Sequence, residues 1–193
     1  MRGTVEVIPQ GTDVPSQAEI DAQGKRELDR LTARIDAARA QFQPRQAEPG
    51  LDGTNQWFIK AGTTELVTAD PRTQILEFFP DDITISAGDT VIWGSDYFHS
   101  ITFIPSPPAP EFVIPQPQEQ GPPILRLNSN VFLPAKPAAN YDPTQYYNSA
   151  DLGPFSLGGS SWALTFNDPG RYEYFCVFHR RQGMKGTITV TVP

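Results

Sequence analysis

The chain has 193 residues, of which 38% are hydrophobic, and it carries a formal net charge of −7. This length and apolar content suit one core with additions. The acidic balance disfavours a surface for nucleic acid or anionic membranes, because both need clustered Lys and Arg. A single Cys excludes an internal disulfide, and no apolar run reaches the length of a bilayer span. The first ten residues lack the apolar segment of a signal peptide.

Residues 1–48 are predicted to form an extension made of a short strand and a helix. Residues 3–8 alternate between apolar and polar types, which favours a strand. Further along, Ser16 and Glu19 form a capping-box pair, and apolar residues then recur every three or four positions, as in a helix. Pro44 is expected to end this helix. The apolar stripe consists of Leu28, Leu31, Ile35, Ala38 and Phe42. We expect the stripe to pack on the rest of the protein, with self-association as the second interpretation.

Residues 49–193 are predicted to form one domain of short strands. From residue 56 onward the side chains alternate with a period of two, and Pro, Gly and Asp punctuate the runs. The expected strands are WFIKAG, ILEFF, DITIS, TVIW, SITFI, SWALTF, RYEYFCV and GTITVTV. About seven strands with turn signals between them indicate an all-β, two-sheet antiparallel Greek-key sandwich with an added N-terminal α-helix.

A long insertion interrupts this pattern at about residues 105–160. Twelve of the twenty Pro residues lie there, together with clusters of Asn, Ser and Gly that favour turns. We expect an irregular segment with one short strand or turn around ILRLNSNVFL.

The residues with metal chemistry lie in the last strands. Cys176 ends a strand, and His179 and Met184 follow in the short loop before the final strand. The second His of the chain, His99, lies 77 positions before the Cys (176 − 99), so only a folded sandwich brings the two together. Two imidazoles, a thiolate and a weak axial thioether are the donor set of a blue-copper electron-transfer site.

Taken one at a time, these residues are more often structural, since a lone Cys in a strand is usually a small buried hydrophobe. Their joint spacing favours the metal site. Among the aromatic residues, Tyr172 is expected to bond back to a preceding turn. Three Trp residues are expected in the core: Trp57, Trp93 and Trp162.

The segment PGRYEYFCVFHRRQGMKGTITV resembles the C-terminal copper motif of plastocyanin-like cupredoxins, and FFPDDITISAGDTVIW with the later HSITF resembles their central strands. These matches cover residues 78–104 and 161–192. By this resemblance the ligands of one copper ion (Cu+/Cu2+) are His99, Cys176, His179 and Met184. Ser100 stands where many members carry an Asn that ties the ligand loops together and hydrogen-bonds near the thiolate. The long insertion is a second departure, and the N-terminal helix is similar to an extension of some bacterial members.

The resemblance implies a one-electron carrier and not an enzyme. Its partners would be redox proteins such as a cytochrome or a terminal oxidase. Its location would be periplasmic or otherwise extracytoplasmic, with a signal or membrane anchor absent from this chain. The expected electron port is the edge of His179 with Phe178 beside it. Arg180 and Arg181 follow directly and either steer an acidic partner or are solvated loop charges.

Three other functions fit parts of the pattern. Nitrite reductases and multicopper oxidases carry the same motif as an electron-entry site, but their second copper centre needs further His, and this chain has two His in all. A Cys with two His can hold catalytic zinc, although a thioether is a poor zinc ligand. A copper carrier or storage protein would favour a more exposed and labile site.

Overall fold

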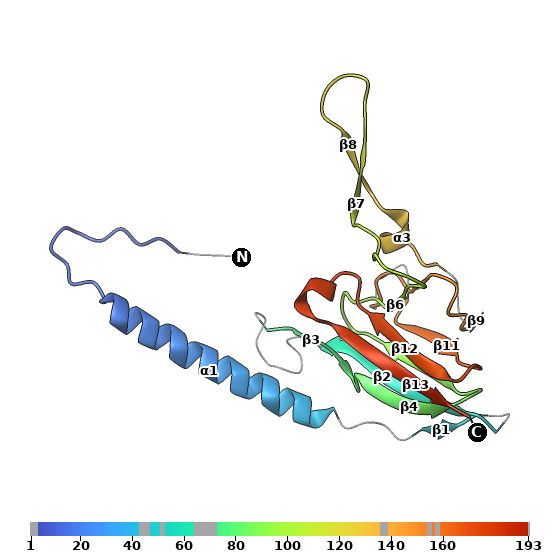
Figure 1. The fold of residues 1–193 in the computed structure, drawn as a ribbon. Helices are drawn as coiled ribbons and strands as arrows, with labels where there is room; N and C mark the ends of the chain where they lie inside the picture. The colour runs from blue at the N-terminus through green and yellow to red at the C-terminus, as the bar shows by residue number, and fades with distance from the viewer. Residues whose placement is uncertain are drawn as a thin grey trace.

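Two β-sheets, one long helix and a projecting hairpin make up the structure (Figure 1), a computed structural model. It describes residues 4–42, 47–50, 53–63, 73–135, 139–153, 156 and 159–192. The expected fold class, an all-β two-sheet sandwich with an added N-terminal α-helix, is confirmed.

The strands form one larger and one smaller sheet that pack around the core. The first sheet contains, in spatial order, β1 (Glu48–Pro49), β2 (Asn55–Thr63), β5 (Thr90–Gly94), β11 (Ser161–Thr165) and β9 (Ala139–Asn140), with β3 (Ile75–Phe79) also paired to β2. The second contains β10 (Tyr147–Asn148), β6 (Thr102–Phe103), β12 (Gly170–Phe175), β13 (Lys185–Thr191) and β4 (Asp82–Ser86). The division of the chain at residues 48 and 49 stays a prediction, although β1 begins there and pairs with β2.

Among the described residues, three strand pairs are parallel: β2 with β5, β13 with β4, and β11 with β9. The expected antiparallel pairing therefore holds for most of the described strand pairs and not for these three. A tight hairpin forces its two strands to be antiparallel. Between β2 and β5, however, the chain passes through β4 of the opposite sheet. No tight hairpin joins β2 to β5, so β5 can run parallel to β2.

Trp93 lies at the centre of the core between the sheets. Alternate residues of β5 are buried, and the ring centroid of Trp93 lies 5.7 Å from that of Trp162 and 5.4 Å from that of Tyr174. Trp57 is partly buried at the edge, where its Nε1–H donates to Asp89 over 2.9 Å. The core prediction is thus confirmed for Trp93 and Trp162, and Trp57 lies at the margin.

The helix α1 (Gln17–Gln41) begins at the predicted capping box. The Glu19 N–H donates to Ser16 Oγ over 3.3 Å, and the Ser16 N–H donates to the Glu19 carboxylate over 2.8 Å. These bonds satisfy two donors that would otherwise be orphaned in the first turn. Pro44, which the sequence predicts to end the helix, lies outside the described residues.

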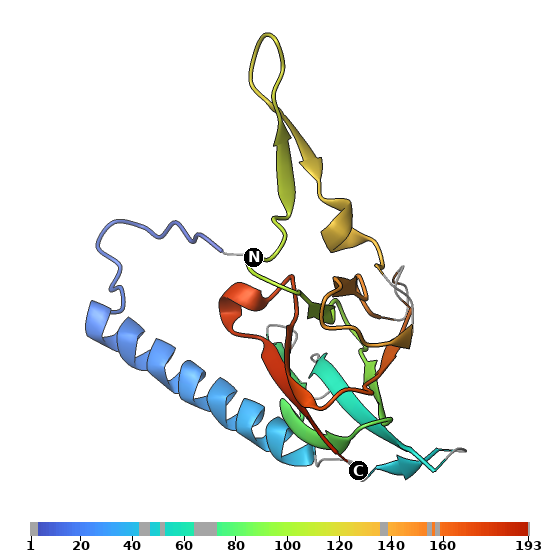
Figure 2. The ribbon, with the colours of Figure 1, turned by 45° about the vertical axis from the view of Figure 1, so that its right-hand side comes forward.

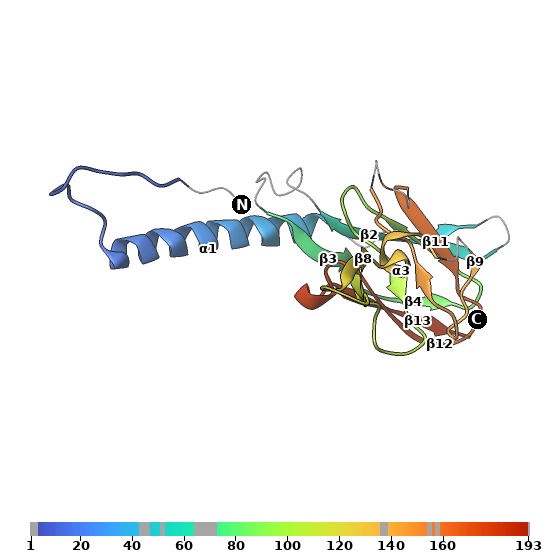
Figure 3. The same ribbon diagram turned by 90° about the horizontal axis from the view of Figure 1, so that it is seen from above.

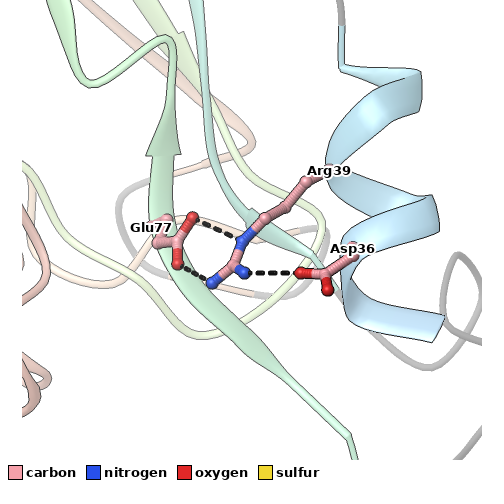
Figure 4. A network of polar contacts seen from close by, with 3 residues as sticks. All are labelled: Asp36, Arg39 and Glu77. Carbon is pink, nitrogen blue, oxygen red and sulfur yellow. Dashed lines mark hydrogen bonds and ion pairs between the residues drawn. The ribbon is translucent and has the colours of Figure 1, made fainter. Parts of the chain in front are cut away.

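The last turns of α1 contact the sandwich. Ala38 is buried, Phe42 stacks on Phe79 with ring centroids 4.6 Å apart, and Arg39 forms a two-pronged ion pair with Glu77 of β3 (Figure 4). Leu28, in contrast, is 63% exposed. The expectation that the stripe packs on the rest of the protein is therefore wrong for Leu28, in keeping with a helix that extends beyond the body of the molecule (Figure 3).

The segment predicted as a strand at residues 3–8 is not one in its described part. Residues 4–8 form no strand, and Val5 and Val7 are more than 90% exposed. Alternation alone does not make a strand, since a strand also needs a neighbour for its backbone hydrogen bonds.

The insertion at about residues 105–160 is more regular than expected. It contains a hairpin of β7 (Val113–Gln116) and β8 (Ile124–Leu127), followed by the short helix α3 (Ser129–Phe132). Figure 2 shows the hairpin rising away from the sandwich. Strands β9 and β10 also belong to the insertion, and each adds to one of the two sheets. The expectation of one short strand or turn is therefore too low.

Candidate metal centre

The loop after β12 folds back on itself and brings three potential ligands together. Cys176 directly follows the strand, and its N–H donates to the Met184 carbonyl over 3.1 Å. The His179 N–H donates to the Cys176 carbonyl over 3.2 Å, and Gly183 closes the turn in a left-handed conformation (φ 89°). The spacing Cys-x2-His-x4-Met thus corresponds to one short loop whose two ends are joined by backbone hydrogen bonds.

His99 reaches the same place from just before β6, the strand beside β12. Its Nδ1 lies 4.0 Å from Cys176 Sγ, and His179 Nδ1 lies 3.4 Å from the same sulfur. The ligand atoms of the three residues all lie within 4.8 Å of one another. The fold therefore brings together residues that are 77 positions apart (176 − 99).

The centre is buried, with one ligand near the surface. His99 and Cys176 are fully buried and Met184 is 1% exposed, whereas His179 is partly exposed. Burial, and then the nearby His179, lower the pKa of His99 to about 3, and burial also lowers the pKa of His179. Both imidazoles are thus neutral at pH 7, which is the form that binds a metal. Burial raises the pKa of the Cys176 thiol, opposed by donors such as the Ser100 N–H.

Ser100 links the two ligand-bearing segments. Its N–H donates to Cys176 Sγ over 3.3 Å, and its hydroxyl lies 3.8 Å from the same sulfur. The hydroxyl oxygen accepts a hydrogen bond from the Val177 N–H over 2.9 Å. Ser100 therefore makes contacts of the kind that the resemblance ascribes to Asn at this position.

Two neighbours of His99 were not anticipated from the sequence. The side-chain nitrogen of Gln74 lies 3.3 Å from His99 Nε2, on the side of the ring away from the sulfur. Gly62 of β2 has a φ of 65°, and a Cβ there would lie 2.0 Å from the same ring nitrogen. A glycine near a strand end is a weak signal for such a close approach, and nothing in the sequence pattern distinguishes Gln74.

An aromatic cluster borders the exposed edge of the centre. Phe178 stacks on Phe98 with ring centroids 4.2 Å apart. Its ring centroid also lies 6.0 Å from that of Phe112 and 5.8 Å from that of Phe132, both in the insertion. Arg180 and Arg181 are exposed beside it. All of the expected port residues therefore lie at one end of the molecule.

The donor chemistry fits copper. Two neutral imidazoles and a sulfur lie within 4.8 Å of one another, and the loop that holds two of them also supplies a buried thioether. A mixed set of soft sulfur and imidazole ligands suits copper better than it suits ions that prefer oxygen ligands.

None of the described helices is both long enough and apolar enough to cross a membrane.

Comparison with known proteins agrees with this donor set. The sequence model of the copper binding proteins of the plastocyanin/azurin family matches residues 64–191. Plastocyanin of Prochlorothrix hollandica is 32% identical over 111 residues, which are 58% of this chain and 60% of that protein. Plastocyanin of Scenedesmus fuscus is 32% identical over 117 residues, 60% of this chain and 87% of that protein. For chloroplastic plastocyanin of Physcomitrium patens the identity is 27% over 116 residues, and the chain spans only 51% of that relative.

Solved structures give a weaker likeness. Plastocyanin of Dryopteris crassirhizoma is 24% identical, with a TM-score of 0.39, over 69% of this chain and 99% of its own. A purple cupredoxin from Nitrosopumilus maritimus is 22% identical, with a TM-score of 0.38, over 69% of this chain and 98% of its own. Both TM-scores are below 0.5, so the assignment of the fold follows from the strand topology and the family match instead.

A β-sandwich that gathers two His, one Cys and one Met at one end defines the class of copper-binding electron-transfer domains. The chain belongs to the plastocyanin/azurin family of copper-binding proteins and is a plastocyanin-like cupredoxin. Its cofactor is copper, and the residues positioned to bind one ion are His99, Cys176, His179 and Met184.

Proposed function

We propose that this protein is a one-electron carrier that shuttles electrons between redox proteins through a single type 1 copper site. The observation that supports this most strongly is the cluster of one thiol and two imidazoles within 4.8 Å, buried except at one imidazole. Copper bound there would supply the one-electron capacity by alternating between Cu(I) and Cu(II).

In this proposal four residues bind the copper ion, and neighbouring residues position two of these ligands. His99, Cys176 and His179 are the strong ligands, and Met184 is the weak axial ligand. Full burial of Cys176 keeps water from the sulfur, and the Ser100 N–H stabilises negative charge on it through the 3.3 Å hydrogen bond. The carboxamide of Gln74 holds the outer edge of His99, so that Nδ1 is the nitrogen that faces the sulfur.

The proposed electron port is the exposed edge of His179. Phe178 provides an apolar contact beside it, and the exposed Arg180 and Arg181 provide a basic rim. Rim charges act mainly on the rate of association with a partner. The partner would be a cytochrome or a terminal oxidase, and the location periplasmic or otherwise extracytoplasmic.

The alternatives find less support. A role as the electron-entry subunit of a copper enzyme needs a second centre from another chain, since both His of this chain lie in the one cluster. A copper carrier or storage protein needs ready release, which the full burial of His99 and Cys176 opposes.

Spectroscopy after addition of Cu(II) tests the proposal. A thiolate ligand should give an intense visible charge-transfer band and a narrow copper hyperfine splitting in electron spin resonance. Cys176→Ala should abolish the band. Wild-type protein that binds Cu(II) and stays colourless in the oxidised state would refute the type 1 site. Colourless Zn(II) bound in preference to Cu(II) would support the zinc alternative instead.

A further inference from the structure

The hairpin β7–β8 with its connecting loop, residues 113–127, projects from the end of the molecule that holds the metal centre (Figures 1 and 2). We call it the arm. Every residue of its two strands is exposed. A two-stranded hairpin alone is marginally stable in water, so an arm with this composition is expected to gain stability from a partner surface.

The two faces of the arm differ in chemistry. Residues directly opposite each other in an antiparallel pair share a face. The register pairs Val113 with Leu127 and Pro115 with Leu125. These four residues make one face wholly apolar, and Leu125 and Leu127 are 68% and 70% exposed. We call them the apolar face of the arm.

The opposite face is mixed. Its pairs are Ile114 with Arg126 and Gln116 with Ile124. The two Ile side chains are 45% and 48% exposed, so they are less accessible than the two Leu of the apolar face. The arm is therefore amphipathic, and this second face offers matched control positions.

The base of the arm is fixed to the metal loop. Asn128 donates through its side chain to the Glu111 carbonyl over 2.8 Å and through its backbone N–H to the Phe112 carbonyl over 2.9 Å. Phe112 in turn contacts Phe178, one residue before His179, at 6.0 Å. A groove of about 560 Å³ lies between the base of the arm and the metal loop. Val113 of the apolar face lines it, so the apolar face continues into the proposed electron port.

The charges beside the groove indicate what kind of surface would fill it. Arg180 and Arg181 line one side, and Glu111 lines the other. In a chain with a net charge of −7, this end is locally basic. A second copy of the chain would bring the same two Arg residues to the contact and so add like charge there, which is unfavourable. An apolar surface with an acidic rim would complement both the face and the rim.

We propose that the apolar face of the arm and the groove at its base form the docking surface for the redox partner, an electron-transfer protein with an apolar patch and an acidic rim. This rests on the proposed function of the metal centre as an electron carrier. Contacts between electron-transfer proteins are small. The arm enlarges the contact on one side of His179 and fixes the orientation in which a partner approaches its edge.

The test uses the copper-loaded full chain and an acidic, soluble c-type cytochrome as the probe. In the reaction followed by stopped flow, Fe(II) of the cytochrome gives one electron to Cu(II), leaving Fe(III) and Cu(I). The variant is Leu125→Thr with Leu127→Thr, and the matched control is Ile114→Thr with Ile124→Thr. Thr has a high strand propensity, so the hairpin is kept in both, and backbone amide signals verify it.

We expect the Leu double variant to lower the second-order rate constant with the cytochrome by about tenfold, which corresponds to a loss of about 1.4 kcal/mol. The Ile control should stay within about twofold of wild type. Ferricyanide is a small ion that needs no docking surface, so oxidation of the Cu(I) form by it should be equal in the wild type and in both double variants. The reaction with a basic cytochrome of similar potential should be slower than with the acidic one.

Different failures have different meanings. If the wild type has no blue band and does not react with ferricyanide, the proposed function fails. If the wild type reacts normally and the two double variants are equal with the cytochrome, the arm is not a docking surface. Faster reaction with the basic cytochrome overturns the acidic-rim assignment. A dimer in light scattering that only the Leu variant dissociates, or lipid-vesicle binding that only the Leu variant loses, overturns a redox partner in favour of a second copy or a membrane.

Discussion

At the scale of single residues, Met184 is the proposed axial ligand, and the axial ligand of a type 1 copper site tunes its redox potential. It is 1% exposed and lies in the loop that begins at Cys176. A thioether favours Cu(I), and an amide oxygen favours Cu(II). We therefore expect Met184→Gln to lower the midpoint potential in voltammetry. A tenfold change in relative affinity for the two states is about 59 mV for one electron, and we expect a shift of at least about that size. An unchanged midpoint would remove Met184 from the site.

Gln74 is expected to act on the copper through His99. Partners of a ligand's outer nitrogen fix its orientation, and losing one typically costs about 10–100-fold in metal affinity or activity. We expect Gln74→Ala to weaken Cu(II) binding by about tenfold in a chelator competition and to alter the visible band. When copper holds Nδ1, Nε2 carries the ring proton, which the amide oxygen of Gln74 accepts once the amide is turned by 180°. Gln74→Glu offers an oxygen acceptor at the same place, so it should restore the affinity. Equal affinity and equal spectra for wild type and Gln74→Ala would show that the 3.3 Å contact has no positioning role.

The sequence predicts the four candidate ligands of the site but not the other residues that contact them. Cys176, His179 and Met184 lie in one loop, so their spacing carries the information. His99 had no rival, because it is the only other His. Gly62 of β2 and Gln74, which directly precedes β3, meet His99 only in the folded protein. Contacts between residues so far apart in sequence are not visible in a local pattern.

At the scale of elements, the capping box makes the start of α1 sensitive to acid. Donation from the Ser16 backbone N–H, and then from its hydroxyl, lowers the pKa of Glu19. A carboxylate with a lowered pKa in the folded state stabilises the helix start above the unfolded value of about 4.3, and this is lost as the pH falls through the folded pKa. We expect hydrogen-exchange protection in the first turn of α1 to fall as the pH is lowered from the unfolded value through the folded pKa of Glu19. Glu19→Gln keeps an acceptor without a titrating charge, so its protection should not change over this range. The same fall in both proteins would contradict the capping explanation.

Regular elements with local signals were predicted well, and those built from distant partners were not. The helix start followed from Ser16 and Glu19, and the Tyr172 hydroxyl donates to the Asp168 carbonyl over 2.9 Å, as expected for a structural Tyr at a turn. Strands β9 and β10 have two residues each and exist only through pairing with β11 and β6. Residues 4–8 show the converse, because they have the pattern of a strand and lack a neighbour.

At the scale of the whole molecule, the last turns of α1 are expected to stabilise the sandwich. Deleting residues 1–46 removes the burial of Ala38, the stack of Phe42 on Phe79 and the ion pair of Arg39 with Glu77. For a chain of this size each kcal/mol lost lowers the melting temperature by roughly 2–4 °C, and we expect a fall of at least that size in calorimetry. The blue band should remain, since no ligand is removed.

Deleting only residues 1–15 is the matched control for this truncation. These residues precede the helix, and those that the structure describes among them are exposed. The melting temperature of this shorter truncation should equal that of the full chain. If the two truncations melt at the same temperature, the contact between α1 and the sandwich contributes no stability, and the helix is a spacer.

The projecting helix also affects how the protein moves through solution. A compact chain of this length would have a radius of gyration of about 16 Å, whereas 25 helical residues alone extend about 37 Å. Figure 3 shows most of this length beyond the sandwich. Such an elongated particle has a large Stokes radius for its mass, so a monomer should elute early from a sizing column and give slow, anisotropic tumbling in relaxation experiments. If the far end of the helix were bound to another molecule, rotation about that point would move the copper end of the sandwich over a large distance.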